Sequence, residues 1–445
     1  MGTGMRELIL ERPWLFTSER LPWVGRGRSI EEFLVRLHLS ALYKNKRASQ
    51  ESLGALQDRK LKHLLRSATR VPFWENRIGA QLLRSNEPLS LIRALPVTTK
   101  DDLRRIPIEE RTDGRLAAHY GVLSHTSGST GEPLAFFVDR RLRTRFWALI
   151  LRVGGLRDVS QKSLVHLWPS PNPNFSFDNH YYAKTMDDLR EQKQEIYDLV
   201  SGPKSVVFGF PSLVRFVFDL ARQDDVTLRP RTVILAGEAL TTEARAWFLE
   251  NSSSRVVNLY GCREISVMAG QCEQGRFHEN SEDVLFEVVS EQGAPLKKGE
   301  SGRLLVTALN NVLAPFIRYD TGDCGAFYSD PCPCGDRSPS FTFDGRTHDV
   351  SAIMLPDGSR ISPYRLTGIF NRRFDKIRQY QIEHYAPSAF RIFIIPTERY
   401  TQEDEAGMLV DMKRIAKTDE VSVNRVDAIS LCGLKALPYV KSFGE

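Results

Sequence analysis

Long hydrophobic runs are missing from this chain of 445 residues. No stretch approaches the roughly 18 consecutive apolar residues that a membrane-spanning helix needs, so we expect no membrane span. The first residues, Met1 to Glu7, lack the apolar core of a secretion signal, which predicts a cytoplasmic protein. Hydrophobic residues make up 41% and charged residues 26%, as in an ordinary globular protein, and the length suits two or three domains.

A strong excess of charge of one sign is also missing. The chain has 61 basic and 55 acidic residues, and no stripe of basic and aromatic residues marks a nucleic-acid site. We therefore expect no nucleic-acid partner, although the small surplus suits anions such as ATP or a coenzyme. Helix surfaces should account for most of the positive charges, including the cluster Arg140, Arg141, Arg143 and Arg145.

Cysteine is scarce, with six residues in the chain. Without a secretion signal, metal binding is a better hypothesis for them than a disulfide framework. A complete tetrahedral set of zinc ligands is formed by Cys272, His278, Cys332 and Cys334, the last two in a tight Cys-Pro-Cys-Gly turn. Four protein ligands leave no position for water, so we predict one structural zinc ion; the alternative is a group of ordinary buried thiols.

Short apolar runs alternate with longer amphipathic segments in the middle of the chain. This alternation is typical of parallel sheets covered by helices. The predicted strands are 121–124, 163–167, 205–208, 232–236 and 256–260, with a helix at 240–250.

The flanking regions have different hydrophobic patterns. Helical periodicity marks an extension within residues 1–75, and 284–289 and 302–309 favour antiparallel strands. A strand at 390–395 followed by a helix at 403–417 fits a small α+β module. We therefore predict an α/β fold with an N-terminal domain over 1–345 and a C-terminal domain over 346–445.

The strongest chemical signal is a loop of small residues after a predicted strand, Thr126-Ser127-Gly128-Ser129-Thr130-Gly131. Its glycines let backbone amides turn inward and its hydroxyls add donors, which suits phosphate oxygens. The Gly-Lys-Ser/Thr ending of a Walker loop is absent. By composition alone, a surface turn is an equally good interpretation.

The order of the motifs decides between these interpretations. The loop resembles the phosphate loop of the adenylate-forming superfamily of acyl-CoA synthetases, adenylation domains and luciferases. Four further segments resemble that superfamily's motifs in the same order: Leu235-Ala236-Gly237-Glu238-Ala239, Asn258-Leu259-Tyr260-Gly261-Cys262-Arg263-Glu264, Tyr319-Asp320-Thr321-Gly322-Asp323 and Gly345-Arg346-Thr347-His348-Asp349. Segments at 68–76, 95–103 and 210–213 make the chain most similar to phenylacetate–CoA ligases and the related capsule-biosynthesis proteins.

The resemblance implies the adenylate-forming fold, a large N-terminal domain of parallel sheets, helices and an antiparallel subdomain with a small mobile C-terminal lid. It also implies ATP and Mg²⁺ as cofactors and makes a homodimer a possible assembly. Residues implied to contact the nucleotide are Thr126, Ser127, Gly128, Ser129, Thr130, Gly131, Gly237, Glu238, Ala239, Tyr260, Gly261, Asp323 and Arg346. Among them Tyr260 would stack on adenine and Asp323 would accept hydrogen bonds from the ribose, while Glu264 would hold Mg²⁺.

The chain departs from the superfamily's pattern in two places. The hinge motif has His348 before Asp349 where two acids are usual, so Asp349 is the predicted hinge. The C-terminal catalytic lysine lacks its usual preceding glycine. Lys441 is the predicted catalytic residue beside Glu264 and Thr130, with Lys435 as the next candidate and a solvated tail lysine as the alternative.

The acid pocket is predicted from aromatic and small residues, namely Phe136, Trp147, Phe208, Phe210 and Ala236. They suit an aryl acid, although such residues are also normal in a core. Arg263 is a candidate partner for an acidic or carbonyl group of the acid. The leading hypothesis is an AMP-forming acid–CoA ligase. The alternatives are transfer to an amine, hydroxyl or carrier protein, and a degenerate nucleotide-binding or scaffold protein.

Overall fold

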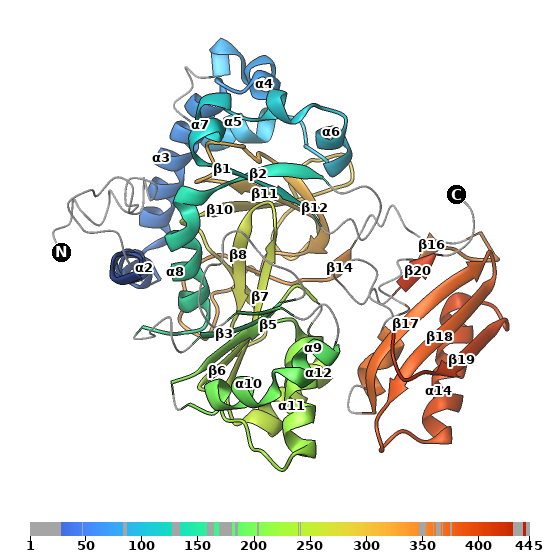
Figure 1. The fold of residues 1–445 in the computed structure, drawn as a ribbon. Coiled ribbons are helices and arrows are strands. Elements are labelled where there is room, and N and C mark those ends of the chain that lie inside the picture. The colour runs from blue at the N-terminus through green and yellow to red at the C-terminus, as the bar shows by residue number, and fades with distance from the viewer. Residues whose placement is uncertain are drawn as a thin grey trace. The chain divides into compact units, whose positions relative to one another are not determined.

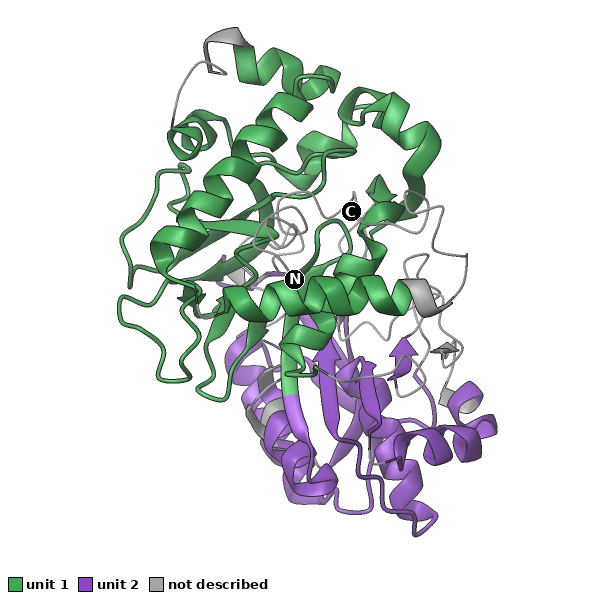
Figure 2. Cartoon of the chain, turned by 90° about the vertical axis from the view of Figure 1, so that its left-hand side faces the viewer, with its two compact units in different colours: residues 1–161, 172–176, 257–345 green, residues 162–171, 177–256, 346–445 purple. Residues whose placement is uncertain are grey.

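The computed structural model describes most of the chain in two compact units (Figure 2). Unit 1 comprises residues 1–161, 172–176 and 257–345, and unit 2 comprises 162–171, 177–256 and 346–445. The described residues are 28–46, 48–82, 87–126, 134–157, 164–168, 180–182, 186–202, 204–238, 240, 242–346, 353–358, 360–361, 366, 368–373, 376–429 and 439–441.

Unit 1 combines helices with antiparallel strands (Figure 1). Its helical elements are α2 (Arg28–Asn45), α3 (Gln50–Ala68), α4 (Pro72–Leu82), α5 (Pro88–Ala94), α6 (Lys100–Arg104), η2 (Ile108–Arg111), α7 (Gly114–Tyr120), η3 (Arg140–Leu142) and α8 (Arg143–Val153). Its strands are β1 (Gly121–His125), β2 (Ala135–Asp139), β7 (Arg255–Cys262, whose first two residues belong to unit 2), β8 (Ser266–Gln271), β9 (Phe277–Glu279), β10 (Val284–Val289), β11 (Gly302–Ala308), β12 (Tyr319–Gly325), β13 (Ser340–Phe341) and β14 (Gly345–Arg346, whose second residue belongs to unit 2).

The described start of unit 1 is helical from Arg28 onward, while the extension as a whole, 1–75, stays a prediction. Ser49 caps α3 by accepting a hydrogen bond from the Ser52 amide. Thr99 and Asp102 cap α6 reciprocally, each side chain accepting from the other residue's backbone N–H. Apolar residues of α3, α4 and α5, among them Leu64, Trp74 and Ile92, pack into one core with β10, β11 and β12.

The antiparallel part of unit 1 was predicted in part. β10 pairs with β11 over Val284–Val289, and β11 with β12, which confirms the antiparallel strands predicted there. The strand predicted at 121–124 is β1, but it forms a two-stranded antiparallel hairpin with β2 and belongs to no parallel sheet. Since β1 and β2 are consecutive described strands that pair antiparallel, the parallel pairing expected for this strand is wrong.

The arginine cluster at 140–145 is not all helix surface. Arg141 and Arg145 are 4% and 2% exposed, and the expectation of solvated charges is wrong for both. Arg141 bonds Asp139 and Arg145 bonds Asp283, so each buried charge has a carboxylate partner. The partner of Arg145 lies 138 residues away in the chain, where no local pattern could announce it.

Unit 2 contains the predicted parallel sheet. The strands β6, β5, β3 and β4 lie in that order with parallel pairing. Buried residues of α10, α11 and α12, including Ile196, Val214 and Phe248, pack on this sheet. The elements of this part are β3 (Leu164–Trp168), β4 (His180–Tyr182), α9 (Met186–Glu191), α10 (Lys193–Val200), β5 (Val206–Gly209), α11 (Pro211–Gln223), β6 (Thr232–Ala236) and α12 (Thr242–Ser252).

The C-terminal part of unit 2 is the predicted α+β module. Its four-stranded sheet has the order β19–β18–β17–β20, and α14 packs on it through Met408 and Met412. Its elements are β15 (Ile353–Met354), β16 (Arg360–Ile361), η5 (Gly368–Arg373), β17 (Ile377–Ala386), β18 (Ala389–Pro396), α14 (Gln402–Ala416), β19 (Val421–Arg425) and β20 (Tyr439–Lys441). The division into domains 1–345 and 346–445 stays a prediction. In the described part of the chain, no helix is both long and apolar enough to span a membrane.

Candidate active site

Of the predicted phosphate loop, the structure describes only its first residue, Thr126, together with Leu134 beyond its end. Thr126 is buried, and its Oγ1 accepts a hydrogen bond from the Leu134 amide at 2.9 Å. The Thr126 amide in turn donates to the Leu134 carbonyl at 3.0 Å. These two bonds fix the chain on either side of the loop. Ser127, Gly128, Ser129, Thr130 and Gly131 lie outside the described residues.

Tyr260 and Asp323 come from two different predicted motifs and are bonded to each other. The Tyr260 hydroxyl donates to Asp323 Oδ2 at 2.6 Å. Burial, together with the Asp323 carboxylate, holds the pKa of Tyr260 well above its usual value, so the phenol stays a donor. Asp323 is buried, and its hydrogen bond to Tyr260 holds the carboxylate in place. A residue that accepts hydrogen bonds from ribose hydroxyls would need such a fixed position.

Glu264 is held by a second hydrogen bond between the same motifs. The Tyr319 hydroxyl donates to Glu264 Oε1 at 3.0 Å. Burial and the adjacent Glu264 carboxylate raise the pKa of Tyr319 well above its usual value. Glu264 itself lies in the three-residue turn between β7 and β8, whose flanking residues Cys262 and Ser266 pair across the hairpin. Sequence reasoning assigned no role to Tyr319, although it stands inside a quoted motif.

Two interactions fix β12, which carries Tyr319 and Asp323. Arg318 has a left-handed backbone with φ of +46°, and its buried guanidinium bonds Glu287 and the carbonyls of Leu95 and Gly293. Thr98 then pairs with the start of β12, since its amide donates to the Arg318 carbonyl and its carbonyl accepts from the Asp320 amide. The segment at 95–103, noticed for its resemblance alone, thus supports the site.

The segment predicted to lie against adenine belongs to unit 2. Gly237 has φ of +81°, and an added Cβ would lie 2.4 Å from Phe210 Cε1, so only glycine fits there. The Glu238 carboxylate accepts hydrogen bonds from the Ser212 amide at 2.9 Å and the Ser212 hydroxyl at 2.8 Å. These bonds satisfy a free amide at the N-terminus of α11. Ala239 lies outside the described residues.

The lid residues are only partly described. Arg346 belongs to β14, and Lys441 to β20, where its backbone pairs with His384; neither side chain is described. Asp349 and Lys435 lie outside the described residues. Their predicted roles stay predictions.

A small cavity in unit 1 lies beside Glu264. It measures about 70 Å³, and its walls include Leu142, Arg145, Phe146, Arg263 and Ser266. The residues predicted for the acid pocket lie elsewhere: Phe136 and Trp147 are buried in unit 1 without lining this cavity, and Phe208, Phe210 and Ala236 are buried in unit 2.

A candidate metal centre forms from the four predicted zinc ligands. The ligand atoms of Cys272, His278, Cys332 and Cys334 all lie within 4.8 Å of one another. The Cys272 and Cys332 sulfurs are 3.7 Å apart, close to the about 3.8 Å edge of a tetrahedron with Zn–S bonds of about 2.3 Å. His278 Nε2 lies 3.3 Å from the Cys334 sulfur. This donor set fits a tetrahedral zinc ion.

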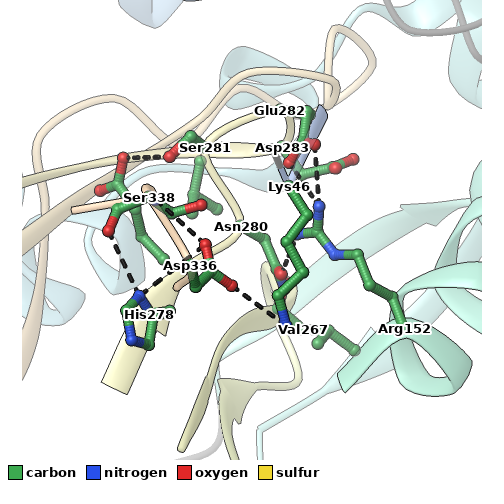
Figure 3. A network of polar contacts seen from close by, with 12 residues as sticks. Lys46, Arg152, Val267, His278, Asn280, Ser281, Glu282, Asp283, Asp336 and Ser338 are labelled. Carbon is green, nitrogen blue, oxygen red and sulfur yellow. Dashed lines mark hydrogen bonds and ion pairs between the residues drawn. The ribbon is translucent and has the colours of Figure 1, made fainter. Parts of the chain in front are cut away.

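The surroundings of the centre orient the imidazole (Figure 3). His278 Nδ1 lies 3.2 Å from the Ser338 carbonyl and 3.9 Å from an Asp336 oxygen, which places the proton on Nδ1 and leaves Nε2 as a ligand. Asp336 also pairs with Lys46 at 3.3 Å. Burial raises the pKa of Cys334 to about 12, so this thiol needs a bound cation to become a thiolate at neutral pH.

The fold is that of the adenylate-forming enzymes, a class of ATP-dependent ligases. The chain aligns over 89% of its length with 2-hydroxyisobutyryl-CoA ligase in its postadenylation state, at a TM-score of 0.70 and 17% identity, covering 91% of that chain. Anthranilate CoA ligase with anthranoyl-AMP aligns over 70% of this chain and 64% of its own, at a TM-score of 0.50 and 13% identity.

Sequence comparison leads to the same class. Phenylacetate-coenzyme A ligase of Escherichia coli K12 is 25% identical over 305 residues, which cover 62% of this chain and 67% of the relative. Malpinin synthetase of Mortierella alpina is 25% identical over 293 residues, which cover 60% of this chain but only 4% of that much longer protein. No protein-family profile matches the chain. The comparisons confirm the resemblance to the superfamily and to its phenylacetate–CoA ligase branch.

Proposed function

We propose that this protein activates a carboxylic acid with ATP, forming an acyl-AMP and pyrophosphate, and then transfers the acyl group to coenzyme A. The observation that carries the proposal is the pair of hydrogen bonds, Tyr260 to Asp323 and Tyr319 to Glu264, that joins the two motifs with predicted nucleotide and magnesium roles. Residues from two separate sequence motifs are thus joined in pairs by hydrogen bonds.

The chemistry requires groups of this kind. A carboxylate that attacks the α-phosphate adds negative charge to oxygens that already repel each other. Magnesium held by Glu264 would offset that charge, and the phosphate loop would supply further donors. Asp323, held by Tyr260, would fix the ribose, while Lys441 would approach from the C-terminal module. Arg263, which donates to the His125 carbonyl at 3.1 Å, ties the Glu264 turn to the strand that leads into the phosphate loop.

Acid-dependent exchange of pyrophosphate into ATP tests the first step. We expect exchange with at least one member of a library of aryl, short polar and fatty acids, in the absence of coenzyme A. Adding coenzyme A should then yield a thioester and release AMP. Exchange without thioester would refute coenzyme A as the acceptor and favour an amine, hydroxyl or carrier protein. Silence across the library, with ATP still bound, would favour a degenerate nucleotide-binding protein.

We further propose that Cys272, His278, Cys332 and Cys334 hold one structural zinc ion. The support is the compact donor set with its oriented imidazole. Four ligands leave no open position, so the ion would stabilise the fold and take no part in the reaction. Elemental analysis of protein never exposed to a chelator should give close to one zinc per chain, and less than about 0.2 would refute the site.

A further inference from the structure

The candidate zinc centre and Tyr260 lie on neighbouring strands of one sheet. In unit 1, β7 pairs with β8 and β8 pairs with β9. The registers align Leu259 with Gly270 and Gly270 with His278, so the zinc ligand His278 lies two strands away from the residue that precedes Tyr260. The two ligands of the Cys-Pro-Cys-Gly turn belong to the loop before β13, and the centre would therefore join that loop to β9.

Tyr260 packs inside a group of phenylalanine rings. Its ring centroid lies 6.0 Å from that of Phe277 and 6.0 Å from that of Phe341. These two rings are stacked on each other with centroids 5.9 Å apart, and their residues are 6% and 0% exposed. Two further rings lie against Tyr260, those of Phe286 and Phe343. Aromatic contacts at such distances are favourable, so these rings fix the direction of the Tyr260 side chain.

Phe277 and Phe341 are also close in the chain to the proposed metal ligands. Phe277 directly precedes His278 in β9. The two-residue strand β13 pairs with β9, and one of its two residue pairs joins Phe341 to Phe277. So short a strand makes few backbone hydrogen bonds, and its attachment depends on the loop that leads into it. An ion shared by His278 and the two cysteines of that loop would fasten the loop to β9.

We propose that Phe277 and Phe341 are positioning residues that couple the zinc centre to the nucleotide site, so that the filled centre strengthens ATP binding through Tyr260. This inference rests on the proposed function and on the proposed zinc ion. Without the ion, β13 would be held less firmly, and Phe341 would confine the Tyr260 ring less. The Tyr260 hydroxyl holds Asp323 at 2.6 Å, so a looser ring leaves more of the ordering to be done when ATP binds.

Removal of zinc tests the coupling. The dissociation constant for MgATP is measured by calorimetry on the zinc-loaded protein, on protein freed of zinc by a chelator, and again after zinc is restored. We expect the zinc-free protein to bind MgATP about fivefold more weakly, and restored zinc to recover the affinity. Equal affinity in zinc-free protein with an unchanged circular dichroism spectrum would overturn the inference, while the proposed function and the zinc ion would stand.

A substitution tests the same route with the ion in place. Phe341→Leu keeps all four metal ligands and removes one ring beside Tyr260. It should retain close to one zinc per chain and raise the dissociation constant for MgATP about two- to tenfold. Phe73→Leu is the matched control, because its buried ring belongs to the same core but packs against Trp74, and it should leave this constant unchanged. If zinc-free protein precipitates, an unchanged constant in Phe341→Leu would still overturn the inference.

Failure of the underlying proposals gives different results. Isolated wild-type protein with less than about 0.2 zinc per chain would refute the zinc ion and the inference with it. Wild-type protein that contains zinc but neither binds MgATP nor exchanges pyrophosphate would refute the proposed function and the inference together.

Discussion

Replacing His38 by leucine should make unit 1 less sensitive to acid. His38 lies on α2, which packs along α8, and its side chain is fully buried. Within the described part of the chain, neither ring nitrogen has a hydrogen-bond partner. Burial, reinforced by the nearby Arg145, lowers the pKa of His38 from 6.5 to about 3. The imidazole of His38 therefore stays neutral in the folded protein at every pH well above 3.

The sign and size of the effect follow from this shift. In the unfolded chain His38 gains a proton below about pH 6.5, while in the folded protein it does so only near pH 3. A base with a lowered folded pKa favours unfolding as the pH falls through this window, because the unfolded state binds more protons. At 1.36 kcal/mol per unit, going from pH 7.5 to 5 costs the wild type about 2 kcal/mol, a term that leucine lacks.

Urea titrations at both pH values, followed by tryptophan fluorescence, measure this difference. The stability of His38→Leu relative to wild type should increase by about 2 kcal/mol between pH 7.5 and 5, and the other titrating groups cancel in the comparison. His119→Leu, at an exposed position of α7, is the matched control. Its stability relative to wild type should change by less than about 0.5 kcal/mol between the two pH values. If the difference in unfolding free energy between His38→Leu and wild type is the same at both pH values, the claim that burial keeps His38 neutral is refuted.

Three further substitutions test the site. Tyr319→Phe should raise the magnesium concentration that gives half-maximal pyrophosphate exchange about tenfold, because Glu264 loses a hydrogen-bond donor. Tyr43→Phe is the control, since it loses only a hydroxyl bond to the Leu156 carbonyl and should leave this concentration unchanged. Tyr260→Phe should raise the KM for ATP about three- to tenfold with the magnesium dependence unchanged, because it releases Asp323. Cys334→Ser should lower the zinc content measured by elemental analysis well below one per chain, while Cys324→Ser, outside the cluster, keeps the wild-type content.

Much of the fold could be predicted because its elements have local signals. The apolar runs at 205–208 and 232–236 are β5 and β6, and the helix predicted at 403–417 is α14 with its capping box at Thr401 and Asp404. The pairing of β1 could not be read in the same way, because an apolar run does not say whether the chain reverses or crosses over after it.

The burial of several charged side chains could not be predicted from the sequence. Arg152 donates to both carboxylate oxygens of Glu282 at 2.8 Å and also bonds Asn280, while Lys60 bonds the Asn310 side chain at 2.7 Å (Figure 3 shows Arg152 and its partners). On its own helix each of these cations looks like an ordinary surface residue. The partners lie more than 120 residues away, so only the tertiary structure shows that the charges are paired and inside.

The site shows why motif spacing and motif pairing are different kinds of information. Tyr260 and Glu264 are four residues apart, and so are Tyr319 and Asp323. Since Tyr260 bonds Asp323 while Glu264 bonds Tyr319, the two motifs run in opposite directions and their equal spacing lets both bonds form together. A sequence shows the two spacings but not the direction, which the strands around the site determine. The arrangement gives each role its own positioning tyrosine, so the loss of one hydroxyl should disturb the ribose or the magnesium ion separately.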